Sequence, residues 1–177
     1  MKSFIIILLS SIAGLLSVSQ SAKGSSVDKG LDDAKIIIIK FLREVYNTQD
    51  DALKIAHQYI EFEDSPDSPS EFSSSKRYEV AAAHITLLRE GEAVGFASPP
   101  LSKEEIAALQ VVPYTSLIST AGNTLLKFRL ADNQSQYLYV VLKNNVAWKY
   151  FYVKENRIYS FDYLLKGESG PAYLFSY

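Results

Sequence analysis

The sequence predicts an α+β fold in which three to four N-terminal helices pack on a curved antiparallel sheet of four to six strands, arranged as a meander. Two observations support this prediction. Up to about Gln110, apolar residues recur at spacings of three and four, which is the period of one helical face. After Pro113 the spacing changes to two, and short aromatic and β-branched runs alternate with turn-forming residues.

The first two helices are expected close together in the chain. An apolar face runs over 31–45, and Asp28 is well placed to cap the start of this helix. A second helix is expected over 48–60, with the Thr48 hydroxyl as its N-cap. Because the first helix is apolar on more than one side, we expect other elements to surround it.

Two further helices have clear end signals. The serines at 73–75 can cap the third helix, and Gly91 can end it, because glycine readily adopts the left-handed conformation of a helix C-terminus. Ser102 and Glu105 have the spacing of a capping box. They predict a short fourth helix that ends near Gln110.

The second half of the chain contains four runs with strand character, and the residues between them are mainly Gly, Asn, Asp and Glu. The expected strands are 125–130, 136–143, 146–153 and 158–165. The segment 166–177 is expected to form a C-terminal arm, which either adds an edge strand or docks in an extended conformation. No internal repeat or second domain is expected, so 23–177 is interpreted as one domain.

The N-terminus predicts export. A lysine at position 2 precedes an apolar stretch from Phe4 to Leu16, and small polar residues follow it. This order is typical of a secretory signal peptide, predicted here over 1–22. The apolar stretch is shorter than the roughly 20 residues that span a bilayer, so we do not expect a membrane-spanning protein after cleavage. A cysteine-free exported domain favours the bacterial periplasm or the cell exterior.

Composition excludes several classes of site. With 18 basic and 20 acidic residues, the chain lacks the basic excess of a typical nucleic-acid-binding protein. It has no cysteine and only two histidines, which argues against a metal site. Its eight glycines are scattered and form no phosphate-binding loop. We therefore expect no cofactor.

The order of elements resembles that of the nuclear transport factor 2-like superfamily, which has a cystatin-like α+β cone. Residues 40–50 look like the usual junction between its first two helices, and 147–153 with 158–161 look like its last hairpin. The resemblance is one of architecture and covers roughly 28–165. It implies a pocket between sheet and helices, in which some members carry out acid–base chemistry and others bind a ligand or a partner.

Two residues are candidates for proton transfer. His84 lies on an apolar helical face, where a neutral imidazole could act as a general base. Asp162 lies between Phe161 and Tyr163 in the last expected strand, where burial would raise the pKa of its carboxyl. A core role is the alternative for both residues, and also for His57. The sequence does not indicate whether His84 and Asp162 meet.

Aromatic residues on the predicted sheet form a candidate ligand surface. The basic residues Lys127, Arg129 and Lys149 alternate with apolar residues along these tyrosine-rich strands, and a sheet face of this composition could bind a sugar or a peptide. The alternative is a solvated outer face that tyrosines cover. The candidate ligand-binding residues are Trp148, Tyr150, Tyr137 and Tyr139.

Three functional hypotheses follow. The favoured one is a non-catalytic binding module that recognises another protein or a small hydrophobic ligand. The second is a pocket enzyme of the isomerase, dehydratase or cyclase type that uses His84 or Asp162. The third is a structural envelope protein that associates through an exposed strand or the C-terminal arm. The tyrosine-rich sheet also suggests a homodimer.

Overall fold

The computed structural model describes residues 26–47, 49–63, 74–91, 99–118, 125–167 and 170–175, so the predicted signal peptide and Thr48 lie outside the described residues. The helices are α1 (Ser26–Asn47), α2 (Ala52–Tyr59), α3 (Ser74–Glu90), α4 (Lys103–Ala108), α5 (Tyr114–Ile118) and the 3₁₀ turn η1 (Gln134–Tyr137). The strands are β1 (Gln110–Pro113), β2 (Leu138–Lys143), β3 (Val146–Lys154), β4 (Arg157–Ser160), β5 (Tyr163–Leu165) and β6 (Ala172–Leu174).

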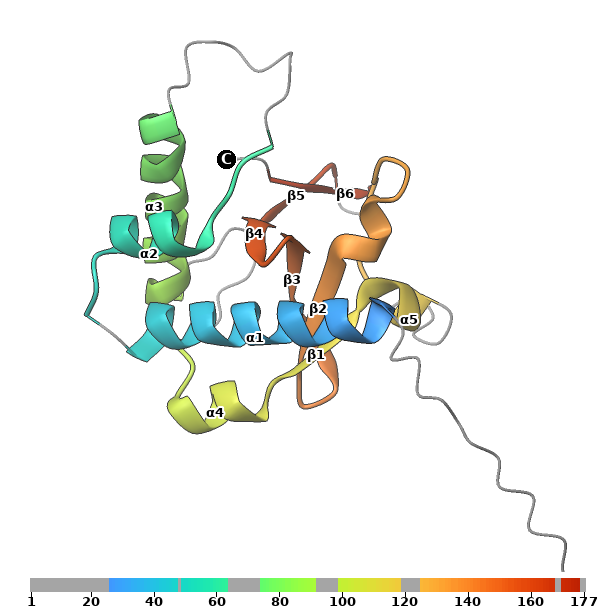
Figure 1. Cartoon of the computed structure of the whole chain (residues 1–177), viewed down its shortest axis with the longest axis horizontal. Coiled ribbons are helices and arrows are strands. Elements are labelled where there is room, and N and C mark those ends of the chain that lie inside the picture. Colours follow the sequence, from blue (N-terminus) through green and yellow to red (C-terminus); the bar gives the residue numbers. More distant parts are fainter. Residues whose placement is uncertain are drawn as a thin grey trace, which may run out of the picture.

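The predicted α+β class is confirmed. Strands β1 to β4 form an antiparallel meander in the order β1-β2-β3-β4, and β5 pairs with β6 in a separate two-stranded sheet. Figure 1 shows α1 lying across the meander, with α2 and α3 beside each other at one end. The C-terminal arm thus contributes β6, which pairs with β5 and not with the meander.

The first strand differs from the prediction. The meander begins at β1, whereas the sequence predicted a helix ending near Gln110 and strands only after Pro113. That helix ends at Ala108 because Leu109 is extended, and the β-branched residues that follow pair with β2. The expected strand 125–130 forms a single bridge within the described chain, between Phe128 and Ala172. Helix α5 was not expected.

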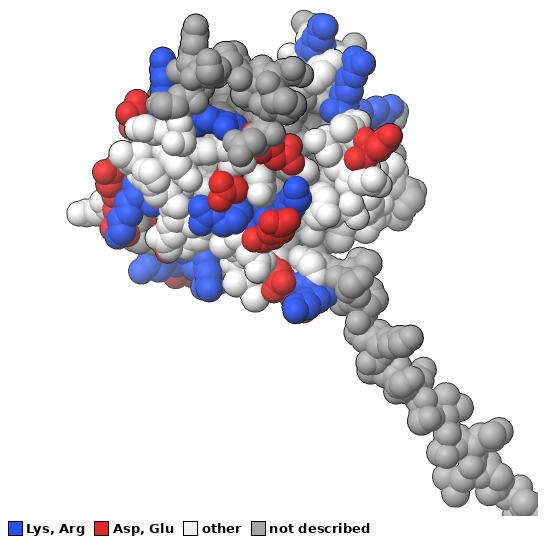
Figure 2. Space-filling model, turned by 45° about the horizontal axis from the view of Figure 1, so that its top comes forward, with Lys and Arg blue, Asp and Glu red and all other residues white. Residues whose placement is uncertain are grey.

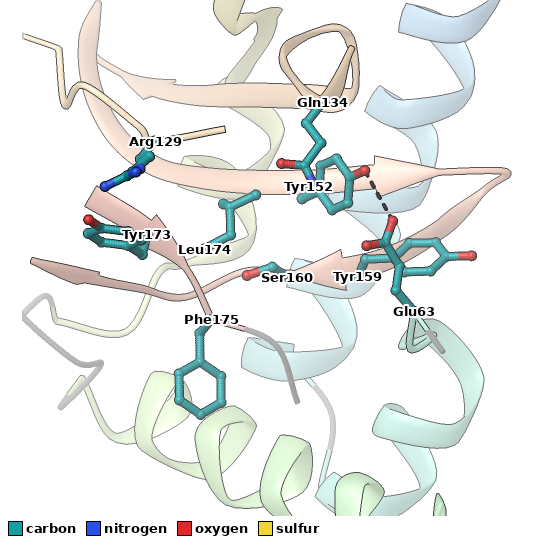
Figure 3. Close-up of a pocket in the computed structure, with 9 residues that line it drawn as sticks. All are labelled: Glu63, Arg129, Gln134, Tyr152, Tyr159, Ser160, Tyr173, Leu174 and Phe175. Carbon is teal, nitrogen blue, oxygen red and sulfur yellow. Dashed lines mark hydrogen bonds between the residues drawn. The ribbon is translucent and has the colours of Figure 1, made fainter. Parts of the chain in front are cut away.

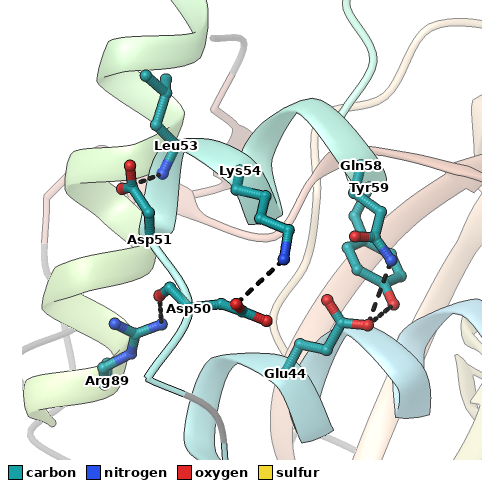
Figure 4. Close-up of polar contacts among 8 residues, drawn as sticks. All are labelled: Glu44, Asp50, Asp51, Leu53, Lys54, Gln58, Tyr59 and Arg89. Carbon is teal, nitrogen blue, oxygen red and sulfur yellow. Dashed lines mark hydrogen bonds and ion pairs between the residues drawn. The ribbon is translucent and has the colours of Figure 1, made fainter.

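Local polar contacts fix the helical layer (Figure 4). Asp51 caps α2 through a 3.0 Å hydrogen bond from the Leu53 amide, in place of the expected Thr48. Glu44 on α1 accepts a 2.6 Å hydrogen bond from the Tyr59 hydroxyl on α2. From α3, the Arg89 guanidinium donates to the main-chain carbonyls of Val45 and Asp50. One arginine therefore joins α3 to the end of α1 and to the segment before α2.

Two other end signals are confirmed. Ser102 and Glu105 form both hydrogen bonds of a capping box at the start of α4. Gly91 follows α3 with a φ of 80°, the left-handed conformation expected of it. None of the described helices has the length and apolar character needed to cross a bilayer.

The sheet is buried on both faces. On one face, a core cluster joins α1, α2, α3 and α4 to the meander, with Phe41 and Phe151 fully buried at its centre. On the other face, Leu138, Val140 and Tyr150 pack with residues of α5, β5 and β6. This second cluster occupies the face that was expected to be solvated. The sheet therefore offers no open tyrosine-covered surface at these residues for a homodimer.

Candidate functional site

His84, Asp162 and Lys149 meet in a buried charged network between α3 and the sheet. The two oxygens of the Asp162 carboxylate are shared: Oδ2 lies 2.8 Å from His84 Nδ1, and Oδ1 accepts a 3.2 Å hydrogen bond from Lys149 Nζ. A carboxylate can only accept, so the proton of the first contact is assigned to Nδ1. Asp162 and Lys149 are 4% and 7% exposed. The structure thus brings together the two proton-transfer candidates.

Asp162 reaches this position because the last expected strand is broken. The sequence analysis predicted a continuous strand over 158–165, but β4 ends at Ser160 and β5 starts at Tyr163. The Ser160 hydroxyl donates to the Asp162 carbonyl at 2.8 Å, a local bond that competes with strand pairing. The Phe175 amide donates to the same carbonyl at 2.9 Å. The chain therefore turns at Phe161 and Asp162.

Lys149 lies on the helical face of β3. It pairs with Val141, and it alternates with Tyr150, which belongs to the core cluster on the other face. Its ammonium group lies 5.9 Å from the centre of the Phe161 ring. The sequence analysis grouped Lys149 with surface cations. Strand alternation places its charge inside the protein, where a carboxylate is needed to balance it.

Burial and pairing act in opposite directions on the two charges. Burial lowers the pKa of the Lys149 ammonium, although Asp162 partly opposes this shift. Burial also raises the pKa of Asp162, but the hydrogen bond from His84 and the charge of Lys149 outweigh it, so the pKa lies below its usual value. The Tyr46 hydroxyl is buried and has no hydrogen-bond partner among the described residues, and burial together with the charge of Asp162 raises its pKa.

A pocket of about 180 Å³ lies next to this network. Its walls come from the end of the α2 segment, from 125–130, and from η1, β3, β4 and β6 (Figure 3). We call it the tyrosine pocket, because three tyrosines line it. The lining residues are Glu63, Arg129, Gln134, Tyr152, Tyr159, Ser160, Tyr173, Leu174 and Phe175.

The charged network supports the pocket and is not part of its lining. Two lining residues, Ser160 and Phe175, donate hydrogen bonds to the Asp162 main chain, and the His84 ring packs 4.7 Å from the Phe175 ring. His84 and Asp162 are not among the lining residues. The charged network can therefore hold Ser160 and Phe175 in place. The Asp162 carboxylate itself does not line the pocket, so a ligand there would not contact it.

The pocket has opposite charges at its two ends. Figure 3 shows Arg129 beside Tyr173 at one end, and Glu63 beside Tyr159 at the other. The Tyr152 hydroxyl donates to Glu63 at 3.3 Å. Burial, followed by the charge of Glu63, raises the pKa of Tyr152 to about 12, so this hydroxyl stays protonated near neutral pH. Glu63, Gln134 and Tyr173 were not recognised from the sequence as ligand-binding candidates, and Arg129 was recognised only as part of a basic and aromatic sheet surface.

The four predicted ligand-binding aromatics are divided among other environments. Tyr150 is buried, and its hydroxyl accepts a hydrogen bond from the Leu126 amide. Trp148 packs half-buried against the helical core. Tyr137 and Tyr139 line a second pocket of about 380 Å³ near the start of the described part of α1, where the Tyr139 hydroxyl donates to the Gly30 carbonyl. The tyrosine pocket contains none of these four residues.

Charged side chains outside the pocket form no obvious second site on the face seen in Figure 2. On the face shown in Figure 2, basic and acidic side chains are interspersed, without a large patch of one sign. Across the described residues, no three His, Asp or Glu side chains are grouped so that they could hold a metal ion. His57 stacks on Tyr78 with ring centres 3.9 Å apart, at the exposed side of α2.

Comparison with known proteins gives no match: no family model fits the chain, and neither a curated protein nor a solved structure is significantly similar to it. The resemblance to the nuclear transport factor 2-like superfamily therefore stays a prediction from architecture. The geometry of the pocket and of the charged network remains the basis for inferring a function.

Proposed function

We propose that the protein is an exported, non-catalytic binding module, and that its ligand enters the tyrosine pocket. One observation carries this proposal: the pocket combines aromatic walls with polar groups whose hydrogen-bonding capacity is incompletely used. Seven of the nine lining residues carry a polar side-chain atom, and the other two are Leu174 and Phe175. A few polar groups that converge in an aromatic pocket are typical of small-molecule sites.

The size of the pocket limits the ligand. At about 180 Å³ it slightly exceeds a cavity of roughly 150 Å³, which holds a benzene molecule. It is smaller than the roughly 300–1,000 Å³ of a site for a drug-sized molecule. The pocket therefore suits a single ring or the end of a longer ligand. Its polar lining favours a more polar ligand than the small hydrophobic molecule expected from the sequence.

A second proposal, a pocket enzyme, is favoured by the 2.8 Å contact between His84 and Asp162. Two features count against it. The carboxylate already has a buried cation as its second partner, and neither residue lines the tyrosine pocket. A general base must come within hydrogen-bonding reach of the proton that it removes. We therefore assign the His84–Asp162 contact a structural role and place binding first.

Native mass spectrometry of the full-length gene product, gently purified from its own host, tests the binding proposal. We expect a bound small molecule, and the mass of the polypeptide should fit cleavage of the predicted signal peptide. The variant Tyr173→Ala removes a pocket wall and should lose the molecule. Tyr137→Ala is the control in the second pocket: it removes a half-buried tyrosine that does not line the tyrosine pocket, although its ring packs 6.2 Å from that of Tyr152, and it should retain the molecule.

Three results would contradict the proposal. Retention by Tyr173→Ala together with loss by Tyr137→Ala would move the site to the second pocket. A bound polypeptide in place of a small molecule would make protein recognition the function. An empty protein would exclude tight binding of a small ligand.

A further inference from the structure

We propose that the tyrosine pocket recognises a sugar acid, that is, a pyranose ring that carries a carboxylate. This inference rests on the proposed binding function and names the class of ligand. Arg129 would bind the carboxylate, the tyrosine rings would pack against the sugar ring, and the end of the pocket near Glu63 would accept its hydroxyl groups. Three features of the pocket support this assignment.

The first feature is an arginine without a side-chain partner. Arg129 is exposed at the mouth of the pocket, and its guanidinium makes no hydrogen bond or ion pair with any residue that the structure describes. Its main chain is held, because its amide donates to the Ala172 carbonyl and the Ala172 amide donates to the Lys127 carbonyl. A guanidinium presents a planar set of donors that matches a carboxylate. Arg129 is thus an available cation on a fixed backbone.

The second feature is the set of tyrosine rings. Tyr152 packs edge-to-face with Tyr159 at 6.0 Å, so these two walls support each other. The hydroxyls of Tyr159 and Tyr173 have no hydrogen-bond partner among the described residues. A pyranose has C–H faces that pack on aromatic rings and hydroxyl edges that need donors and acceptors. Tyrosine offers both kinds of surface in one side chain.

The third feature gives the ligand a direction. Glu63 uses one carboxylate oxygen, Oε1, to accept the Tyr152 hydroxyl, and an acidic group placed at this end would be repelled. Gln134 uses its side-chain oxygen to accept the Ala131 amide, so its NH₂ group is left to donate. The carboxylate of the ligand is therefore directed toward Arg129, and its hydroxyl groups toward Glu63 and Gln134.

The C-terminus of a peptide would also carry a carboxylate, but the lining favours a sugar. Only Leu174 and Phe175 among the lining residues are fully apolar, so a hydrophobic side chain would leave most polar groups of the lining without a hydrogen-bond partner. The polar side-chain atoms of the other seven residues match the hydroxyl groups of a sugar better. A pocket of about 180 Å³ also suits one ring more closely than a peptide.

Isothermal titration of the mature protein with three probes tests the inference: methyl glucuronide, methyl glucoside and hippurate. Before titration, the protein is unfolded and refolded to remove any bound ligand. Methyl glucuronide should bind at least about tenfold more tightly than methyl glucoside, because only the uronide offers Arg129 a carboxylate. Arg129→Gln should reduce uronide affinity to about the level of the glucoside, because the carboxylate then loses its cationic partner. Lys127→Gln removes an exposed neighbouring cation outside the pocket and should change neither affinity.

The outcomes separate this inference from the proposed function. Equal binding of uronide and glucoside, or uronide binding that Arg129→Gln does not weaken, would overturn the role of the carboxylate while leaving a sugar-binding pocket. Hippurate binding as tight as that of the uronide would overturn the assignment to sugars. If none of the probes binds but native mass spectrometry finds a ligand that Tyr173→Ala loses, the sugar acid is wrong and the pocket still binds. An equal loss in Lys127→Gln would show that only net charge matters.

Discussion

Replacing Asp162 by asparagine should strongly destabilise the protein without changing the volume of the core. The substitution removes the negative charge that balances Lys149, a residue that is only 7% exposed and whose ammonium group donates to Asp162. Breaking a buried ion pair by removing one partner costs about 3–5 kcal/mol. In a domain of about 150–250 residues, 1 kcal/mol corresponds to about 2–4 °C in Tm. We therefore expect Tm to fall by roughly 6–20 °C.

Urea unfolding, followed by tryptophan fluorescence, measures the loss of stability in Asp162→Asn. Trp148 is the only tryptophan of the chain and packs half-buried against the helical core, so its fluorescence reports unfolding. The double variant Lys149→Met/Asp162→Asn removes both charges of the pair. It should be more stable than Asp162→Asn alone, because no unbalanced ammonium is left buried. A loss below about 1 kcal/mol in Asp162→Asn, or additive effects in the double variant, would refute the buried-pair argument.

Three more predictions concern pH, turn conformation and buried hydroxyls. The pKa of Asp162 is lowered in the folded state, so its carboxylate stabilises the fold fully above the ordinary pKa of 3.8. This stabilisation is lost as the pH falls through the lower pKa of the folded state. In urea unfolding, the difference in stability between wild type and Asp162→Asn should therefore narrow below about pH 4. Glu155 has a φ of 51° in the turn between β3 and β4, a left-handed conformation that asparagine adopts more readily than glutamate. Glu155→Asn should therefore raise stability by about 0.5–1 kcal/mol in urea unfolding. An equal gain in Glu155→Ala would contradict this explanation. Tyr150→Phe should lower stability by about 0.5–1.5 kcal/mol, because the Leu126 amide loses its acceptor. Tyr46→Phe should leave stability unchanged, because the Tyr46 hydroxyl has no partner among the described residues. Equal losses of stability in the two variants, measured by thermal unfolding, would contradict this difference between a bonded and an unbonded hydroxyl.

Features set by neighbouring residues were predictable from the sequence. The capping box of α4 depends on two side chains three positions apart, and Gly91 acts through its own φ angle. The separators at 144–145 and 155–156 both form turns with positive φ. In such cases the interaction that decides the local structure joins residues that are close together in the sequence.

The start of the meander was missed because it depends on distant partners. The run 125–130 alternates as well as a strand should, yet β2 pairs with the four residues of β1. Periodicity reports which side chains share a face, but it does not report which backbone supplies the hydrogen bonds.

The sequence of β2 does indicate that both faces of the sheet are buried. The burial of β2 is continuous from Leu138 to Val141, and an unbroken apolar run of this kind is typical of strands covered on both sides. Interpreting the tyrosines as an outer cover gave too little weight to this run.

The charged network and the pocket could be predicted only in part. His84 and Asp162 were identified as candidates, but they lie 78 positions apart. Their contact depends on the end of β4 at Ser160, which the alternation of residues does not reveal. Arg129 was noted as part of a basic and aromatic surface, whereas its position beside Tyr173 depends on the bridge between Phe128 and Ala172. The position of Arg129 thus depends on the packing of β6, for which the sequence predicted either an edge strand or an extended arm.

The most direct test of the account is to locate the bound ligand by NMR. Amide spectra would be compared for the protein as purified from its host and for the same sample after unfolding, removal of small molecules and refolding. We predict that the largest shift changes lie at pocket residues such as Arg129, Tyr152, Tyr159 and Tyr173, and that the amides of Gly30 and Leu31 in the second pocket change little. Changes centred on Tyr137 and the start of α1, or identical spectra, would contradict the claim that this pocket is the binding site.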